Sequence, residues 1–312
     1  MATTTNATRN LIFCDIDGTI AHYPDILTTL GKIIPSPEST TGIAFEDKES
    51  GQRYDILAFP PSSTGLQGYI SVHTLELIRD LRRQGHVFVI ISGARYSTIM
   101  ERLPYLPQAD AYVVENGGRI FLTDSRALTA LPASEDMKWR ETHNEVAGSV
   151  HEVSKPIAER QGPLWDVYRS LKDGQWPVDA RSYTTEFRVK ATPSLGKTEE
   201  MLCEALGKLP STMTSSYNLG SADVYPATSG KDLAAAYLMK HFDVATDRSF
   251  CMCDDDNDMA MAKLMAHAYL PGVTAASVQQ CVDADPAKFT VSPQGGFVGT
   301  HQALEAILKR SR

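Results

Sequence analysis

Short apolar runs alternate with amphipathic segments of helical spacing through most of the chain. Apolar runs of strand length lie at 11–14, 87–91, 111–114, 249–253, 268–270 and 289–291. Helical spacing is found at 72–85, 96–103, 231–242, 257–268, 274–284 and 300–309. Continuous apolar runs are typical of parallel strands that are buried on both faces. Their alternation with helices predicts an α/β fold, with a doubly wound, Rossmann-like parallel sheet as its core.

Two segments interrupt this alternation. In 22–69, prolines and Gly/Ser/Thr clusters surround two strand-like stretches, 42–45 and 54–59, which flank a polar turn and predict a flap-like β-hairpin. In 119–221 the parallel-strand pattern disappears, all three tryptophans occur, and helix-like segments mix with alternating strands. We therefore expect a catalytic core made of 1–118 and 222–312, with the hairpin insertion at about 22–69. We expect 119–221 to form an inserted α+β domain.

Composition excludes several classes of protein. The 312 residues are 42% hydrophobic and 22% charged, as in ordinary globular proteins, and the net charge of −8 argues against a nucleic-acid-binding surface. No apolar run approaches the roughly 18 residues of a membrane span, and the Thr-rich start does not resemble a secretory signal. The odd number of cysteines, five, fits reduced thiols. We expect a cytoplasmic protein that binds neither nucleic acid nor membranes.

The most informative polar motif follows the first apolar run directly. Asp15 and Asp17, separated by one residue and followed by Gly18 and Thr19, lie where a parallel strand ends. Ligands bind at this edge of doubly wound sheets. An aspartate there can act as a nucleophile toward a phosphoryl group, with a second acid beside it. The alternative is a simple turn, because Asp and Gly are common turn residues.

Two further segments supply groups that bind phosphate. Ser92-Gly93-Ala94-Arg95 joins a strand to a helix, where a hydroxyl and successive N–H groups can hold an anion. The alternative for Ser92 is a helix N-cap. Lys231 begins a helix, a position that the helix dipole disfavours for a cation. This position suggests that the Lys231 charge neutralises Asp15 and phosphate oxygens.

A cluster of acids follows the strand at 249–253. Asp254, Asp255, Asp256 and Asp258 repel one another, and a divalent cation would relieve that repulsion. An EF-hand calcium loop does not fit, because its sixth position would be Met259 rather than Gly and its twelfth Met265 rather than Glu. Oxygen ligands from two strand ends favour Mg²⁺.

These four motifs, in this order, resemble those of the haloacid dehalogenase-like hydrolase superfamily. Glu115-Asn116-Gly117-Gly118 before the long insertion is similar to the branch whose cap domain lies between the second and third motifs. Gly296-Phe297-Val298 before the last helix also looks like that branch. The branch includes sucrose-phosphate, trehalose-phosphate and hexose-phosphate phosphatases, and phosphomannomutase. The chain departs from the pattern at Cys253, where glycine is usual, and in its longer hairpin insertion.

The resemblance implies a role for each matching residue. Asp15 would be the nucleophile, Asp17 the general acid and base, and Ser92 and Lys231 the phosphate-binding residues. Mg²⁺ would be held by Asp15, the backbone carbonyl of Asp17, Asp254 and Asp258. The remaining substrate-binding positions would be Gly18, Gly93, Ala94, Arg95, Asn116 and Asn257.

The resemblance implies a Mg²⁺-dependent phosphatase that acts on a small phosphate monoester, such as a sugar phosphate, through an aspartyl-phosphate. The alternatives are a phosphomutase and a non-catalytic binding protein with the same fold. In the insertion, Arg181, Arg188 and Lys190 either contact a second anionic group or lie on a solvated strand face, and we favour the solvated face. For the aromatic residues there we favour a role in the core over stacking on a sugar: Trp139, Trp165, Tyr168, Trp176, Tyr183 and Phe187.

Overall fold

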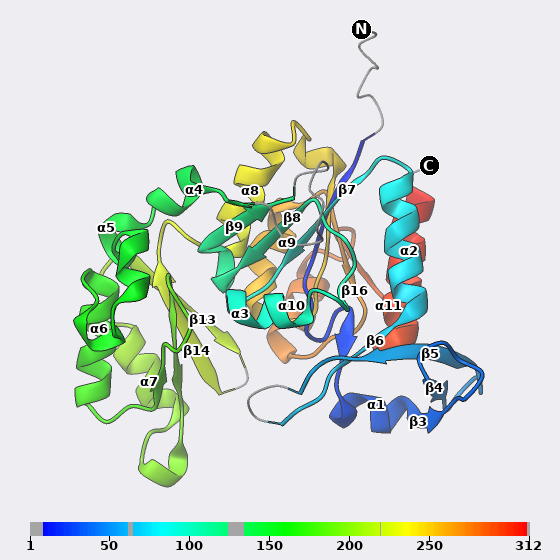
Figure 1. Cartoon of the computed structure of the whole chain (residues 1–312), viewed down its shortest axis with the longest axis horizontal. Coiled ribbons are helices and arrows are strands. Elements are labelled where there is room, and N and C mark those ends of the chain that lie inside the picture. The colour runs from blue at the N-terminus through cyan, green and yellow to red at the C-terminus, as the bar shows by residue number, and fades with distance from the viewer. Residues whose placement is uncertain (1–8, 62–64, 124–133, 219, 311–312) are drawn as a thin grey trace, which may run out of the picture.

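An eight-stranded sheet forms the centre of the molecule (Figure 1). A computed structural model describes residues 9–61, 65–123, 134–218 and 220–310. In spatial order the strands are β10 (Ser134–Glu135), β9 (Arg119–Leu122), β8 (Ala111–Val114), β7 (Val87–Ile91), β1 (Leu11–Cys14), β15 (Ser249–Met252), β16 (His267–Leu270) and β17 (Phe289–Val291). The strands from β8 to β17 run parallel, whereas β9 and β10 extend the sheet in antiparallel fashion.

Helices cover both faces of this sheet. On one face lie α2 (Val72–Arg83), α3 (Tyr96–Arg102) and α11 (Gly296–Arg310); on the other lie α8 (Lys231–His241), α9 (Met259–Leu264) and α10 (Ala276–Ala284). The side chains of β1 alternate between the two cores, with Ile12 and Cys14 on the first side and Leu11 and Phe13 on the second. This arrangement confirms the predicted α/β fold with a doubly wound sheet.

The strand order reverses beside β1. From β1 the chain proceeds outward to β7 and β8, and it later returns to β15 on the other side of β1 before continuing to β16 and β17. The carboxyl ends of β1 and β15 are therefore neighbours at a topological switch point, where doubly wound sheets bind their ligands. Asp15 follows the first of these strands and Asp254 comes two residues after the second.

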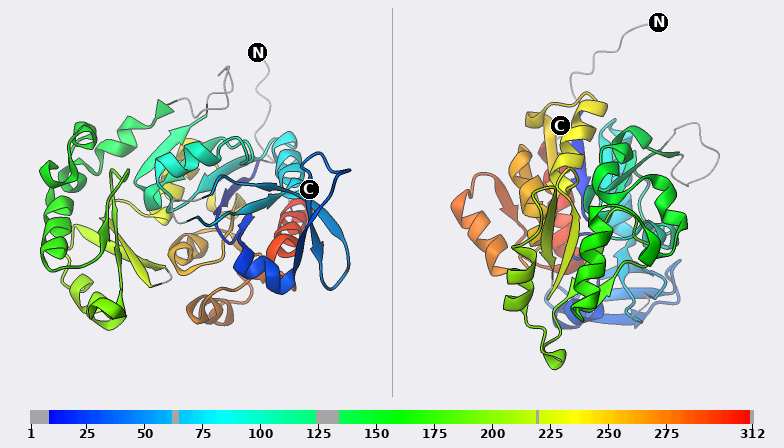
Figure 2. Two further views of the ribbon diagram at one scale, coloured as in Figure 1. Left: turned by 60° about the horizontal axis from the view of Figure 1, so that its bottom comes forward. Right: turned by 90° about the vertical axis from the view of Figure 1, so that its left-hand side faces the viewer.

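A smaller four-stranded antiparallel sheet lies to one side of the main sheet (Figure 2). Its strands, in spatial order, are β11 (Val178–Asp179), β12 (Phe187–Lys190), β14 (Ser221–Pro226) and β13 (Met213–Asn218). The helices of this part are α4 (Met137–Glu141), α5 (Asn144–Ala147), α6 (Pro163–Asp173) and α7 (Glu199–Leu206). A separate apolar core containing Trp165, Tyr168 and Phe187 joins α5, α6 and α7 to the sheet, as favoured for these aromatic residues. Trp139, by contrast, packs in the core of the main sheet.

The chain passes from one sheet to the other at positions that differ from the limits expected from the sequence. We expected the insertion at 119–221, yet β9 and β10 pair in the main sheet and β14 pairs in the smaller one. A division that followed the sheets would place the boundaries after Glu135 and after Pro226. The division into a core and an inserted domain remains our proposal.

The segment expected to be a hairpin is a larger unit. The expected strands are present as β4 (Ile43–Asp47) and β5 (Arg53–Ala58), but they belong to a five-stranded sheet with β3 (Gly31–Pro35), β6 (Tyr69–Ser71) and β2 (Ala21–His22). A helix, α1 (Pro24–Leu30), packs beside it. Phe45 packs its ring against that of Phe297 at the start of α11, with the centroids 5.3 Å apart, which fixes the unit to the core.

Two helices differ from their expected limits. The helix expected over 257–268 is shorter at both ends and consists of α9 alone. The acidic loop continues through a 3₁₀ turn, Asp256–Asp258, and β16 already begins at His267. The last helix begins at Gly296 rather than at Thr300. The five cysteines are free thiols, and among the described residues no helix has the length and apolar character needed to cross a membrane.

Candidate active site

Three carboxylates meet at the switch point of the main sheet. Asp15, Asp254 and Asp258 come from the ends of two neighbouring strands and from the 3₁₀ turn before α9. One oxygen of each lies within 4.8 Å of the others, and all three residues are buried. The structure thus brings together the acids predicted from two motifs more than 200 positions apart.

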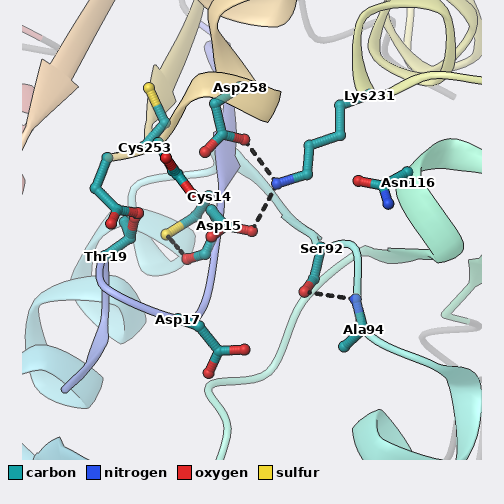
Figure 3. Close-up of polar contacts among 12 residues, drawn as sticks. Cys14, Asp15, Asp17, Thr19, Ser92, Ala94, Asn116, Lys231, Cys253 and Asp258 are labelled. Atoms are coloured by element: carbon teal, nitrogen blue, oxygen red, sulfur yellow. Dashed lines mark hydrogen bonds and ion pairs between the residues drawn. The ribbon is translucent and has the colours of Figure 1, made fainter. Parts of the chain in front are cut away.

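Lys231 connects two members of this cluster (Figure 3). Its Nζ donates to Oδ1 of Asp15 at 2.9 Å and to Oδ1 of Asp258 at 2.7 Å. The side chain is 2% exposed, so these contacts are shielded from water. Burial acts to lower the pKa of Lys231, but the charges of the two aspartates outweigh it and raise that pKa. The amine is therefore a fixed positive charge beside Asp15.

One lysine does not balance three buried carboxylates. Burial raises the pKa of Asp15 to about 7 even though Lys231 acts to lower it. Burial, together with the charges of Asp15 and Asp258, also raises the pKa of Asp254 well above its usual value. Oδ2 of Asp258 is buried and has no hydrogen-bond partner within the described residues. An all-oxygen donor set with excess negative charge and an unpaired oxygen fits a hard divalent cation.

The tight turn after β1 explains Gly18 and Thr19. Gly18 has a φ of +83°, and a Cβ on it would collide with the carboxylate of Asp254. Only glycine allows both this backbone conformation and this approach. Thr19 donates from Oγ1 to Oδ1 of Asp254 at 2.8 Å, and Thr274 donates to the Asp254 carbonyl at 2.6 Å. Two hydroxyls thus hold Asp254 in the cluster.

A cavity of about 510 Å³ opens beside these acids. Asp15, Asp17 and the loop from Ser92 to Arg95 line it from the core, together with Asn257. The smaller sheet and the segment before β12 supply the facing wall, including Tyr183, Arg188 and Lys190. This size suits a small metabolite.

Ser92 does not cap a helix, contrary to the alternative that the sequence left open. The helix α3 begins at Tyr96 with Arg95 in the cap position, and Oγ of Ser92 accepts from the N–H of Ala94 at 3.1 Å. The loop of Ser92, Gly93 and Ala94 lines the cavity, and the hydrogen bond between Ala94 and Ser92 lies within the loop itself. This geometry keeps the hydroxyl proton of Ser92 available for a ligand.

Asp17 is held apart from the buried cluster by two residues that no sequence motif predicted. Arg102 donates from Nη1 to Oδ1 of Asp17 at 2.8 Å, and Tyr23 donates to the same oxygen at 2.6 Å. Arg102 also donates to the Tyr23 hydroxyl at 2.9 Å, which closes the triangle. Figure 3 shows the Asp17 carboxyl lying away from the group around Lys231. Tyr23 comes from the segment before α1 and Arg102 from the end of α3, and neither lies in a motif.

Asn116 does not line the cavity. It has a φ of +48°, and its Nδ2 donates to the buried carboxylates of Glu186 at 2.9 Å and Asp223 at 3.2 Å. Burial, with the charges of Asp223 and Glu115 adding to it, raises the pKa of Glu186 well above its usual value. In this structure Asn116 therefore connects the end of β8 to the smaller sheet, whereas the sequence placed it among the substrate-binding residues.

Glu115 strengthens the same connection. Its Oε2 accepts hydrogen bonds from the N–H and hydroxyl groups of Thr184 and Thr185, at 2.7–3.0 Å.

Gly117 has a φ of +91°, and a Cβ there would collide with the backbone of Gly230. The glycine therefore permits close approach of the two crossing segments.

Cys253, which stands where the sequence resemblance leads us to expect glycine, packs in the core. Cys253 is fully buried, and its Sγ lies 4.0 Å from that of Cys251 on the same side of the chain. Its side chain packs in the cluster with α8 and α9 rather than among the carboxylates. Cysteine at this position therefore does not fill the acidic site.

Solved structures have a fold similar to that of this chain, and a family model matches its sequence. None of the curated proteins matches the chain. The sucrose-phosphatase of Synechocystis sp. PCC6803, solved with sucrose and phosphate, has a similar fold, with a TM-score of 0.59 and 14% identity over 97% of this chain and 98% of that one. The phosphatase BT1666 of Bacteroides thetaiotaomicron gives a TM-score of 0.55 and 13% identity, over 100% and 98% of the two chains.

A third similar structure is the subclass IIB sugar phosphatase BT4131, with a TM-score of 0.51 and 14% identity over 96% of this chain and 98% of that one. These likenesses concern the fold. A sequence model of a family, the haloacid dehalogenase-like hydrolases, matches residues 66–280, which include Ser92, Lys231 and Asp254. The order of the motifs, the doubly wound sheet and this match agree: the chain belongs to the haloacid dehalogenase-like hydrolase family.

Proposed function

We propose that the protein is a Mg²⁺-dependent phosphatase that hydrolyses a small phosphate monoester, such as a sugar phosphate, through an aspartyl-phosphate at Asp15. The observation that carries this proposal is the position of Asp15. Its carboxyl lies at the wall of the cavity, beside the Lys231 amine and two further buried acids. Asp17, the second acid of the same motif, lines the same cavity.

The reaction would proceed in two displacements at phosphorus. In the first, a carboxylate oxygen of Asp15 forms a bond to phosphorus while the bond to the leaving oxygen breaks, and Asp17 gives that oxygen a proton. In the second, Asp17 takes a proton from water, whose oxygen bonds to phosphorus and releases Asp15 as carboxylate. Lys231 and the loop at Ser92 would hold the phosphoryl oxygens in both steps.

Asp15, Asp254 and Asp258 would hold Mg²⁺, with the backbone carbonyl of Asp17 as predicted from the sequence. When bound there, Mg²⁺ supplies positive charge next to the phosphoryl oxygens. Thr19 would keep Asp254 oriented through its 2.8 Å hydrogen bond. The other predicted substrate-binding positions on the cavity wall are Gly93, Ala94, Arg95 and Asn257.

We also propose that the inserted α+β domain acts as a cap that closes over the cavity and selects the substrate. The cavity has walls from both parts of the molecule, so a change in their separation would open or close it. Closure would exclude water while the aspartyl-phosphate forms. A phosphomutase would use the same residues in the first step, but would return the phosphoryl group to a sugar hydroxyl.

Release of inorganic phosphate from a panel of sugar phosphates, with and without Mg²⁺, tests this proposal. A phosphatase releases phosphate from at least one of them at a rate that depends on the metal. A mutase would instead require a sugar bisphosphate activator and would yield an isomer. Failure to release phosphate or to isomerise any compound, including p-nitrophenyl phosphate, would favour a binding protein.

Tyr23→Phe is expected to lower turnover of sugar phosphates by about 10-fold, because proton transfer by a positioned acid contributes roughly 10²–10⁴-fold and the variant loosens Asp17 without removing it. The loss should be smaller with p-nitrophenyl phosphate, whose leaving group needs little protonation. Tyr54→Phe, on β5, is the control for removing a hydroxyl from the same sheet unit. Equal losses with both substrates would mean that Tyr23 acts through folding alone.

Mg²⁺ should stabilise the protein more at about pH 7.5 than at about pH 5. Burial raises the pKa of Asp15 to about 7 and also raises that of Asp254, so the folded protein retains protons that the unfolded chain releases. The metal-free protein therefore loses stability as the pH rises from about 4 toward 7, and a cation can bind once the protons leave. Thermal unfolding with and without Mg²⁺ measures this. A Mg²⁺ effect that does not vary with pH would argue against binding at these acids.

A further inference from the structure

We infer that the substrate carries a second anionic group, a carboxylate or a second phosphate, which binds to the smaller sheet opposite Asp15. This inference rests on the proposed phosphatase function and names its substrate class. The residues that carry it are Arg188 and Lys190 on β12, with Arg181 and Arg95 beside them.

The alternation of side chains along β12 directs two cations into the cavity. Phe187 and Val189 are fully buried in the core of the smaller sheet, so Arg188 and Lys190 project from the opposite face. That face lines the same cavity as Asp15 and Ser92. We expected a solvated strand face for both residues: Lys190 is indeed exposed, although it also lines the cavity, whereas Arg188 is partly buried and paired with Asp223, which corrects the expectation for that residue.

Arg188 is held in place from behind. Its Nε and Nη2 donate to the two carboxylate oxygens of Asp223 at 2.7 and 2.8 Å, and Asp223 is only 2% exposed. The pairing with Asp223 raises the pKa of Arg188 against the effect of burial. Within the described residues Nη1 has no hydrogen bond, so one edge of an immobilised guanidinium remains for a ligand. A fixed fork of this kind suits a carboxylate or a phosphate.

Arg95 is fixed in a similar way from the core side. Its Nη2 donates to Asp179 at 2.6 Å, and its guanidinium lies over the ring of Tyr183 at 4.6 Å from the centroid. Asp179 also accepts from Arg181. These contacts join the loop before α3 to the smaller sheet at the cavity.

Among the described residues, the cations on this side of the cavity outnumber the carboxylates that pair with them, while the other acids that line the cavity, Asp15, Asp17 and Asp255, come from the core. Four cationic side chains line the cavity here, whereas Asp179 and Asp223 are the carboxylates that pair with them. The side chain of Lys190 forms no hydrogen bond or ion pair with the described residues. A neutral sugar would leave this excess charge uncompensated as water is excluded, which is unfavourable. An anion at the far end of the substrate would neutralise it, while the transferred phosphoryl group is held at Lys231 and the metal site.

Sugar phosphates with and without a second anionic group test this inference. Glucose 6-phosphate has a neutral far end, 6-phosphogluconate carries a carboxylate, and fructose 1,6-bisphosphate carries a second phosphate. We expect kcat/KM to be at least about 10-fold higher for one of the two doubly anionic compounds, as expected for about 1.4 kcal/mol of added binding. The better of the two identifies the group. Equal or lower values for both would overturn the inference, and p-nitrophenyl phosphate would show separately whether the phosphatase chemistry operates.

The variant Lys190→Gln tests whether Lys190 contacts the second anionic group of the substrate. The ratio of kcat/KM for the preferred doubly anionic substrate to that for glucose 6-phosphate should fall by about 5- to 10-fold. Lys208→Gln removes another exposed charge from the same part of the chain, where Lys208 pairs with Glu204 outside the cavity, and should leave the ratio unchanged. A ratio that does not change in Lys190→Gln, or that changes equally in Lys208→Gln, would contradict a specific contact.

A binding measurement keeps the test independent of catalysis. In an Asp15→Asn background, calorimetric titration should give a lower Kd for the doubly anionic compound than for glucose 6-phosphate, by the same factor. The difference should shrink when Lys190→Gln is added. Equal affinities for the two compounds would overturn the inference even in a protein that hydrolyses nothing.

Discussion

Replacing Asp15 with Asn is expected to reduce phosphatase turnover by at least about 10³-fold, as for other covalent nucleophiles. The amide keeps the volume of the side chain and its contact with Lys231, but it lacks the nucleophilic oxygen that would bond to phosphorus. Initial rates of phosphate release from p-nitrophenyl phosphate measure the effect. That substrate makes the fewest demands on the cap, so the result reports on the chemistry alone.

The fold should survive this substitution. Asp15 is buried and its burial raises its pKa, so a neutral side chain there removes an unfavourable charge. Thermal unfolding should therefore show a melting temperature no lower than that of the parent protein. Asp283→Asn, on the exposed side of α10, is the matched control and should retain full activity. Turnover by Asp15→Asn within about 10-fold of the parent would exclude the covalent mechanism at this residue.

Loss of the metal is expected to be comparably severe. Chelation with EDTA should lower turnover by about 10²-fold or more, because a divalent cation contributes several kcal/mol at a phosphoryl group, and added Mg²⁺ should restore it. Asp254→Ala should have the same effect by removing a member of the buried cluster. Titration calorimetry should show weakened Mg²⁺ binding in this variant.

Asp256→Ala is the control for the register of the acidic loop. Asp256 is exposed and accepts a hydrogen bond from Ser277 at 2.5 Å, outside the buried cluster. Its replacement should leave turnover within about 2-fold, as for most exposed substitutions. An inactive Asp256→Ala together with an active Asp254→Ala would show that a different part of the loop holds the metal.

The framework of the main sheet was predictable because each buried parallel strand is a continuous apolar run. The runs at 87–91 and 111–114 coincide with β7 and β8. Strands β9 and β10 escaped prediction, since β10 has only two residues and its pairing with β9 depends on tertiary contact rather than on local pattern. The five-stranded unit was recognised only at β4 and β5: β2 and β6 have two and three residues, too few to show a period, and β3 begins at Gly31 and ends at Pro35, residues that are typical of loops.

The residues of the candidate site that could be predicted from the sequence are those that follow a strand or begin a helix. Asp15, Asp254 and Lys231 each follow or begin an element, so the sequence already indicated that they would meet. Tyr23 and Arg102 carry no such signal, because a tyrosine in an irregular segment and an arginine at a helix end are ordinary surface residues in a sequence. Only the fold brings them to Asp17.

Detection of a phosphoryl group on Asp15 is the decisive test of the covalent mechanism. The protein is mixed with substrate and Mg²⁺, quenched in acid within the first turnover, digested, and analysed by mass spectrometry. We expect one added phosphoryl group on the peptide that contains Asp15, lost on treatment with hydroxylamine and absent from Asp15→Asn. A phosphoryl group on another residue, or rapid turnover with no phosphorylated peptide at any quench time, would contradict the account.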